Sequence, residues 1–154
     1  MTTSRAAILT FALLTSCSFG VEQYRERPPA PSLAIRMVAI EGAEGEVLPR
    51  WSGATDELLA VEHGVVVESH NIVHVRLLVS PDGSRILVLD LDDTGRSRLA
   101  EASTLHVGRR LAIVVDGRIV AAPTILTPLT EGEAYVAVPD PELERAFDAL
   151  SAEN

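Results

Sequence analysis

The sequence contains little cysteine, few aromatic residues and no lysine. Its 154 residues include one cysteine, one tryptophan, two tyrosines and three phenylalanines. A single thiol cannot form a disulfide within the chain, even in an oxidising compartment. Because aromatic side chains are scarce and hydrophobic residues make up 47% of the chain, the core must consist mostly of valine, leucine, isoleucine and alanine. All 13 basic residues are arginine, which indicates a bias of composition and not a particular chemistry.

Positive charge is also scarce. The 13 basic residues stand against 22 acidic ones, which gives a net charge of −9. The sequence has no basic stripe to neutralise phosphates, so it argues against nucleic-acid binding and against docking on anionic lipid by charge.

Long apolar runs are missing too. Residues 6–14 are apolar except for Thr10, but a membrane-spanning helix needs about 20 such residues, and no other stretch approaches that length.

The first residues have the form of a bacterial lipoprotein signal. Arg5 precedes the apolar run 6–14, and the run leads through small residues to the only cysteine, Cys17. This order predicts a signal peptide over residues 1–16, cleavage before Cys17, and lipidation of its thiol by acyl chains such as palmitate. An ordinary signal with a chance cysteine, or a buried N-terminal helix, is the alternative. Ser18 replaces the aspartate that marks inner-membrane retention in some bacteria, which favours the outer membrane.

A tether is expected after the cysteine. Residues 18–32 contain three prolines, few apolar residues and no hydrophobic period, a composition typical of extended, semi-rigid spacers. We therefore assign the lipidated cysteine and a proline-rich tether to residues 17–32. The folded domain is expected to cover residues 33–154.

Alternating apolar residues and turn signals predict a sheet. Alternation, or a short apolar run bounded by glycine, proline or aspartate, is typical of strands. Such patterns cover residues 33–40, 64–69, 72–79, 85–91, 111–115, 118–122 and 134–138. Residues 41–57 are rich in glycine and acid and are expected to form a loop. Trp51 in this loop is interpreted as a cap on a core edge, with a binding contact as the alternative.

Two segments have helical periodicity. From Asp92 to Val107 the apolar residues recur at every third position, with aspartate at the start and Gly108 after the end, as helix caps require. Residues 140–150 begin with Asp-Pro and carry one apolar face. Together the patterns predict an α+β fold, a mostly antiparallel sheet of about six strands with two helices packed on one face.

The residues that could carry chemistry do not form a recognisable site. On a strand, His70 and His74 would share a face but lie about 13 Å apart, so they could not bind one metal ion. Asp90, Asp92 and Asp93 cluster after a strand, and helix capping explains the last two; a hydrolase that uses these acids is a further hypothesis. Nucleotide-binding and nucleophile motifs are absent. We expect no enzymatic activity, no cofactor and no metal.

The phrase GRRLAIVVDGRIVAAPTI, residues 108–125, is more specific than a generic hairpin. It resembles the periplasmic head subdomain of SecD, the protein-export accessory subunit that also occurs fused as SecDF. In that family the order begins with a strand that ends in a phrase like L-D-x-x-G and a helix rich in arginine and alanine. The hairpin comes next, followed by a P-I-T-x-G-x-A phrase and an amphipathic helix. The matching segments here are LDDTG (91–95), LAE (99–101), GRR (108–110), LAIVVDG (111–117), APTI (122–125), PLTEGEA (128–134) and the helix from Pro141.

The resemblance implies the fold of the SecD head and a role in contacting exported polypeptide. It extends over roughly residues 60–152. In SecD, membrane spans carry the acidic residues that couple proton flow to movement of the head. Those spans are missing from this sequence, so the resemblance does not extend to proton-driven translocation. The family head also supplies no catalytic residue.

We therefore expect a non-enzymatic, lipid-anchored protein of the bacterial cell envelope that faces the periplasm. It would bind exported polypeptide or a Sec or envelope component. Arg118, Ile119 and Leu129 are candidate contacts, because the sheet edge near 111–122 and the loop 126–133 are suited to holding a peptide strand. Alternatively, charge and proline merely blunt that edge. The other functional hypothesis is a structural or adaptor lipoprotein of the envelope with no role in export.

Overall fold

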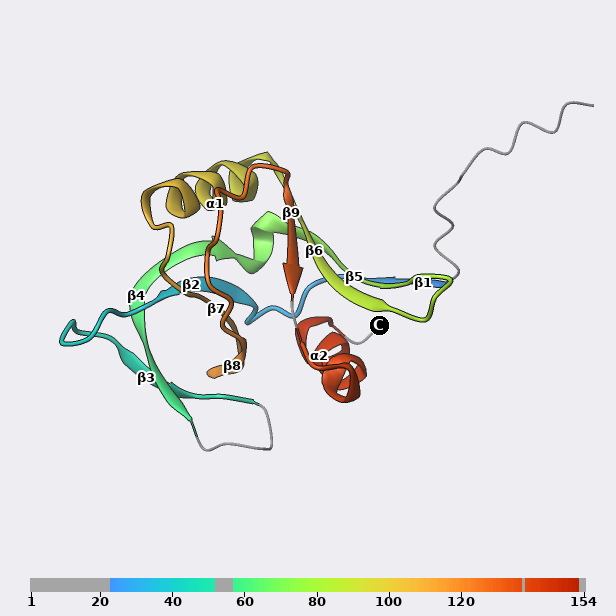
Figure 1. Ribbon diagram of the computed structural model, residues 1–154, viewed down its shortest axis with the longest axis horizontal. Coiled ribbons are helices and arrows are strands. Elements are labelled where there is room, and N and C mark those ends of the chain that lie inside the picture. Colours follow the sequence, from blue (N-terminus) through green and yellow to red (C-terminus); the bar gives the residue numbers. More distant parts are fainter. Residues whose placement is uncertain (1–22, 52–56, 137, 153–154) are drawn as a thin grey trace, which may run out of the picture.

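The computed structural model describes residues 23–51, 57–136 and 138–152, and Figure 1 shows how they are arranged. The strands are β1 (Gln23–Arg27), β2 (Ala34–Val38), β3 (Glu46–Pro49), β4 (Leu58–Glu68), β5 (Ile72–Val79), β6 (Arg85–Leu91), β7 (Leu111–Val115), β8 (Arg118–Ala121) and β9 (Glu133–Val136). The helices are α1 (Asp93–Leu105) and α2 (Leu143–Leu150), with 3-10 turns at Ser69–Asn71 and Asp140–Glu142. The predicted signal peptide 1–16 and Cys17 lie outside the described residues.

The described strands form two sheets. One has four strands in the order β1-β5-β6-β9, and the other has five in the order β3-β4-β2-β7-β8. Every pair of neighbours is antiparallel. The predicted α+β class with antiparallel strands is confirmed, but the described residues form nine strands in two sheets where the sequence indicated about six in one. β1 and β3 are additional to the predicted strands. β1 pairs with β5, which is distant in the sequence. β3 lies within residues 41–57, whose composition is typical of a loop.

The five-stranded sheet curls until its two outer strands meet. Arg50, just after β3, forms a parallel bridge with Ile119 of β8, and the Trp51 N–H donates a hydrogen bond of 2.8 Å to the Ile119 carbonyl. Inside the curl lies a small core of Leu48, Val61, Ala112, Val114 and Ile119. The curl therefore covers part of the free edge of β8.

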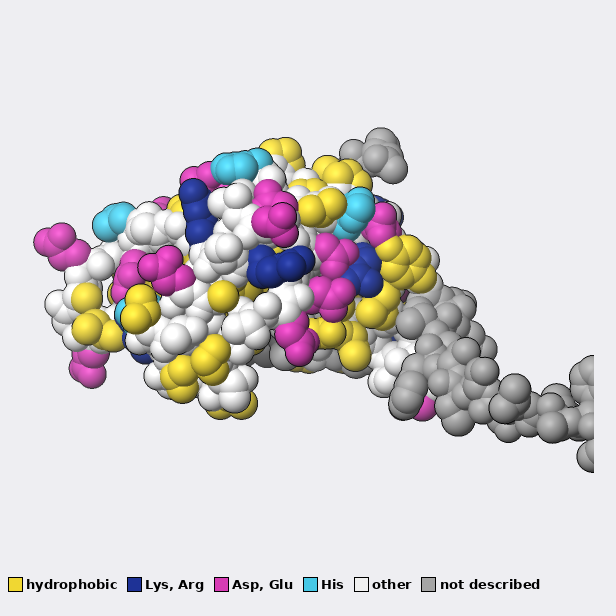
Figure 2. Space-filling model, turned by 90° about the horizontal axis from the view of Figure 1, so that it is seen from above, with side chains coloured by type: hydrophobic (Ala, Val, Ile, Leu, Met, Phe, Trp, Pro, Cys, Tyr) yellow, Lys and Arg dark blue, Asp and Glu magenta, His cyan; other side chains and the backbone are white. Residues whose placement is uncertain are grey.

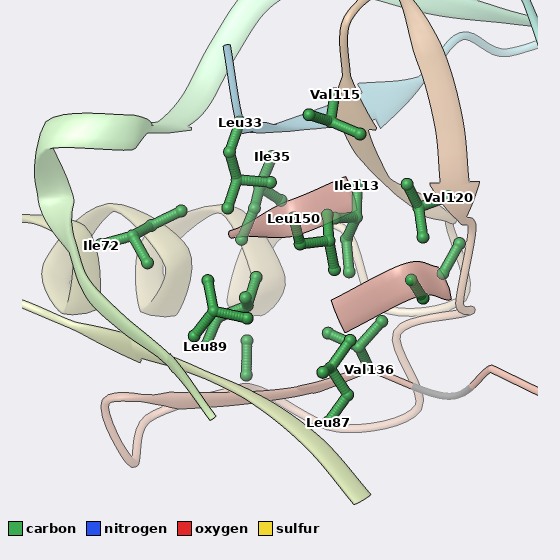
Figure 3. Packing of buried hydrophobic residues seen from close by; sticks show 14 of the residues in the cluster. Leu33, Ile35, Ile72, Leu87, Leu89, Ile113, Val115, Val120, Val136 and Leu150 are labelled. Carbon is green, nitrogen blue, oxygen red and sulfur yellow. The ribbon is translucent and has the colours of Figure 1, made fainter. Parts of the chain in front are cut away.

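The main core lies between the two sheets and is closed by both helices. In Figure 3, Ile35 and Ile113 of the five-stranded sheet face the same space as Leu89 of the four-stranded sheet. α1 packs mainly against β4, whereas α2 packs against β5 and β6. α1 also contacts β6, so both helices reach the four-stranded sheet. Trp51 packs against this core, in agreement with its interpretation as an edge cap.

The folded part begins earlier than the sequence suggested. β1 lies within the predicted tether 17–32 and pairs with β5 along its whole length. The Ala30 N–H donates to the Leu150 carbonyl at 2.8 Å, so the segment after β1 is bound to the end of α2. The Q-Y-R-E-R stretch is almost entirely polar or charged, so it carries no strand pattern, and the prolines after it are typical of a spacer. Its pairing partner lies some fifty residues away, and local patterns cannot indicate that.

Local signals placed the helices well. Asp92 is the N-cap of α1, and its side chain accepts a hydrogen bond of 2.7 Å from the Gly95 N–H. α1 ends at Leu105, and Gly108 has a φ of +88° in the turn that follows. α2 begins at Leu143 after a 3-10 turn and buries its apolar face. Among the described residues, no helix has the length and apolar character needed to cross a membrane.

Candidate functional site

A pocket of about 230 Å³ opens between α1, β7, β9 and the segment 123–129 that leads from β8 to β9. Leu99, Leu111 and Ile113 are almost completely buried and line its interior. Leu126 and Tyr135 line its mouth, with 80% and 56% of their surfaces exposed. The lining is predominantly apolar and includes no ionisable side chain other than the tyrosine. Its chemistry therefore suits burial of an apolar group and not a reaction.

The segment 123–129 is held in place from both sides. The Leu111 N–H donates to the Pro123 carbonyl at 2.9 Å, and the Ile125 N–H donates to the Arg109 carbonyl at 2.8 Å. Further along, the Leu129 N–H donates to the hydroxyl of Ser103 at 2.8 Å. Ser103 lies on α1 and is completely buried. These bonds fix one wall of the pocket to the strand β7 and the helix α1, so the pocket is largely preformed.

A charge cluster lies on the other face of the four-stranded sheet, beside the mouth. Arg76 pairs with Asp90 and, at 2.6 Å, with Glu133. The hydrogen bond to Asp90, opposed in part by desolvation, raises the pKa of Arg76. The Tyr135 hydroxyl donates to Glu133 at 3.0 Å, and this bond raises the pKa of Tyr135. The face seen in Figure 2 likewise carries acidic side chains grouped around arginines.

The structure separates the predicted contact residues. Leu129 is half-buried and lines the pocket, while Arg118 is exposed beside the turn of the β7–β8 hairpin. Ile119 is completely buried inside the curled sheet, so its side chain is not available to a partner. The expected open edge near 111–122 is also different, because β7 lies inside its sheet and the segment at Arg50 covers part of β8.

The acidic and histidine residues serve local structure. Asp92 is the cap of α1, and Asp90 is paired with Arg76, so the hypothesis of a hydrolase at these acids gains no support. His74 lies 3.2 Å from Glu26, and His70 lies 3.2 Å from Glu68. Within the described ranges, no three His, Cys, Asp or Glu side chains are grouped closely enough to hold a metal ion.

Sequence patterns missed most of the pocket. The sequence places Leu99 in a helical pattern and Leu111 and Tyr135 in strand patterns, and it gives Leu126 no role. The available signal was an apolar residue, Leu126, in the loop that follows the A-P-T-I phrase; the structure places it at the mouth of the pocket. The pocket itself could not be predicted, since its walls come from strands and a helix of both halves of the chain.

Comparison with known proteins gives one consistent family. Residues 45–140 match the family model of the SecDF P1 head subdomain. The SecDF translocase subunit of Brucella abortus is 36% identical over 90 residues, which cover 58% of this chain and 11% of that protein. The SecD subunit of Treponema pallidum is 33% identical over 99 residues, or 64% of this chain and 16% of that protein. The chain thus spans only a small fraction of the length of these relatives.

Solved structures show the same likeness. A crystal structure of SecDF in a super-membrane-facing form superposes with a TM-score of 0.57 and 25% identity, covering 76% of this chain and 18% of the other. A structure of SecDF described as a membrane component that enhances protein export gives a TM-score of 0.55 and 22% identity, covering 78% and 61%. The pocket walls from Leu99 to Tyr135 fall inside the range that the family model matches.

Proposed function

The chain belongs to the SecDF P1 head family, and we propose that it is a lipid-anchored, non-enzymatic accessory protein of export that binds polypeptide in the apolar pocket. Membership of the family supports a role related to protein export. The proton-driven activity of a whole SecDF is not part of the proposal, because the chain corresponds to a small part of such proteins. The partners that we propose from the family are exported polypeptide and the Sec translocon itself.

The pocket is the observation that carries the proposal. Its interior is apolar, its mouth exposes Leu126 and Tyr135, and its wall is fixed by the Ser103–Leu129 hydrogen bond. A preformed apolar recess at the surface is suited to a side chain that would be buried in a folded protein but is exposed in an unfolded one. Binding of such side chains needs no catalytic group, which agrees with the absence of a reactive side chain from the lining.

The anchor at Cys17 completes the proposal. In an extended chain each residue spans at most about 3.6 Å, and β1 begins at Gln23. The domain would then stay within about 20 Å of the lipid anchor. The pocket would therefore remain close to a membrane surface, on the periplasmic side. Replacing Cys17 with alanine should release the protein from the membrane without changing its fold.

Site-specific photo-crosslinking in cells tests the binding role. A photoreactive residue at position 126 or 129 should give adducts with exported proteins that have not yet folded, identified by mass spectrometry. The same residue at Leu58, which is 62% exposed and does not line the pocket, is the matched control. Adducts with a single envelope protein from all three positions would instead favour the adaptor hypothesis.

A binding measurement with purified protein tests the pocket directly. The probe is a permanently unfolded protein, reduced and carboxymethylated lactalbumin, compared with its native form. We expect the wild type to bind the unfolded form, and Thr127→Trp to lose this binding, because Thr127 is exposed and lines the mouth. Equal binding of the unfolded and native forms, or no effect of the tryptophan, would contradict the proposal.

A further inference from the structure

The pocket opens along the free side of an outer strand. β9 is the last strand of the four-stranded sheet, and among the described strands it pairs with β6 alone. Ala134 and Tyr135 of β9 line one side of the pocket, and residues 124–127 line the other. Figure 1 shows the segment that follows β8 rising beside β9 as β9 descends. The pocket mouth therefore adjoins a strand edge that can accept another strand.

The register shows which backbone groups β9 presents at that edge. Val136 pairs with Leu87, and Ala134 with Leu89. The Leu91 N–H donates to the Gly132 carbonyl, which is the next pair in the same register. In an antiparallel ladder, hydrogen-bonded pairs alternate with pairs that are not hydrogen-bonded. The backbones of Ala134 and Val136 thus bond to β6.

The N–H and C=O groups of Glu133 and Tyr135 consequently point away from β6, towards the free edge. The other side of β6 agrees with this assignment. The Ser80 N–H donates to the Ser84 carbonyl in the β5–β6 register, so Ile86 and Val88 bond to β5. The backbone N–H and C=O groups of Leu87 and Leu89 therefore face β9.

An added strand would place alternate side chains in different surroundings. Side chains of paired residues lie on the same face of a sheet, so the residue opposite Ala134 would point to the buried side, where the pocket lies. The pocket of about 230 Å³ is smaller than the roughly 300–1,000 Å³ of typical small-molecule sites. Its size suits one large apolar side chain.

The neighbours of that residue would lie opposite Glu133 and Tyr135, on the face with the charge cluster. Arg76 is shared between Asp90 and Glu133, so two carboxylates meet one guanidinium and one negative charge is left over. Exposed Glu131 lies close enough to contribute to the raised pKa of Tyr135. Basic side chains on both sides of the apolar residue would therefore be favoured by charge.

We propose that an extended polypeptide segment adds to β9 as an antiparallel strand, with one large apolar side chain in the pocket and basic residues next to it facing Glu133. The inference rests on the proposed function, because it specifies how the pocket holds its polypeptide. Strand addition predicts that binding depends on the peptide sequence and on particular backbone N–H groups of the peptide. Simple burial of a side chain predicts only that peptides with apolar side chains bind better.

A fluorescein-labelled peptide of sequence TTTRLRTTT is the probe, measured by fluorescence anisotropy against the whole chain. TTTELETTT and TTTRSRTTT are the matched controls for charge and for the apolar anchor, and both should bind more weakly. The arginine N–H groups should face β9, and the leucine N–H should face away. N-methylation of an arginine should weaken binding by about tenfold or more, because one hydrogen bond is lost and the edge is obstructed. N-methylation of the leucine should have little effect.

A protein variant gives a second test. Tyr135→Pro removes an N–H that faces the free edge, and proline is tolerated at such positions of outer strands. Tyr135→Val retains the N–H and serves as the control. We expect the proline variant to bind the peptide more weakly than the valine variant, with both folded by circular dichroism.

The outcomes separate this inference from the proposed function. Equal tolerance of both N-methylated peptides, together with loss of binding in Thr127→Trp, would overturn strand addition and leave the pocket as a side-chain site. Binding of unfolded lactalbumin without binding of TTTRLRTTT would overturn the predicted sequence preference and strand mode alone. Failure to bind either probe would overturn both proposals.

Discussion

The guanidinium carbon of Arg27 lies 5.0 Å from the centre of the Phe147 ring. A residue of the first strand thus covers the ring of the C-terminal helix, and Arg25 approaches the same ring at 5.1 Å. Phe147 itself is completely buried. Cation–ring contacts of this kind contribute about 0.5–1 kcal/mol at exposed sites and more where water is excluded. The two ends of the domain are therefore joined by packing as well as by hydrogen bonds.

Phe147→Ala should be strongly destabilising. It removes the largest fully buried side chain of the core and the ring under both arginines, and such truncations cost about 3–5 kcal/mol. Urea unfolding followed by circular dichroism measures the loss. Leu126→Ala, at a position 80% exposed, should change the free energy of unfolding by less than about 0.5 kcal/mol. Similar losses in both variants would contradict the packing described for α2.

Gly95→Ala should destabilise the protein even though alanine is the better helix former. A Cβ at Gly95 would lie 2.8 Å from the Asn71 carbonyl oxygen, which belongs to the backbone and cannot move freely. The substitution would otherwise stabilise a helix by about 1 kcal/mol. A melting temperature below that of the wild type would therefore show the cost of the close approach to Asn71. Ser97→Ala, at an exposed position of the same helix, should be neutral or slightly stabilising. A gain in Gly95→Ala would show that the turn at Asn71 adapts.

Ser103→Ala should loosen the wall of the pocket. The buried hydroxyl accepts the Leu129 N–H and donates to the Ala100 carbonyl. Its removal leaves a half-buried N–H without its partner, and the full cost for a buried donor is about 1–3 kcal/mol. Hydrogen exchange at Leu129 should become faster, and binding of unfolded lactalbumin should weaken. Thr104→Ala removes an exposed hydroxyl that bonds only within the helix and should leave both measurements unchanged.

Stability should fall in acid partly through Asp92. The hydrogen bond from the Gly95 N–H holds the pKa of Asp92 below its usual value. A carboxyl with a depressed pKa in the folded state contributes stability that is present above its unfolded pKa of about 3.9. That contribution is lost as the pH falls through the folded pKa.

The measurement is urea unfolding at a series of pH values from 7 downwards to about 2, below the usual range for aspartate. Asp92→Asn keeps a capping oxygen but does not titrate, so its stability should decline less steeply below about pH 4 than that of the wild type. Parallel curves for the two proteins would mean that other carboxylates account for the acid sensitivity.

What the sequence could predict depends on how far apart the contributing residues lie. The cap at Asp92, the Asp116–Gly117 turn with φ values of +48° and +70°, and the hairpin around it follow from neighbouring residues. β1 and β3 depend on partners elsewhere in the chain, and their own composition resembles a tether and a loop. The sequence therefore predicts a single sheet, because no local pattern indicates where a set of strands divides into two sheets.

The candidate site follows the same rule. The phrase around residues 108–125 identified the family, because it is a contiguous motif. It did not identify Ile119 as a buried residue, since Leu48 and Val61, which pack with its side chain, lie far away in the sequence. Leu129 could be anticipated from its loop. Its partner Ser103 could not, because a serine within a helix is usually exposed.

The pairing between residues 28–30 and 150–152 has a consequence for how such a domain can be used. Pro29 forms a bridge with Ser151, and the Ala152 N–H donates to the Pro28 carbonyl. The chain that leaves α2 therefore lies one interstrand spacing, about 5 Å, from the segment that follows β1. Cutting either segment away would leave backbone groups of the other without their hydrogen-bond partners, so the N-terminal and C-terminal boundaries of this domain are set together.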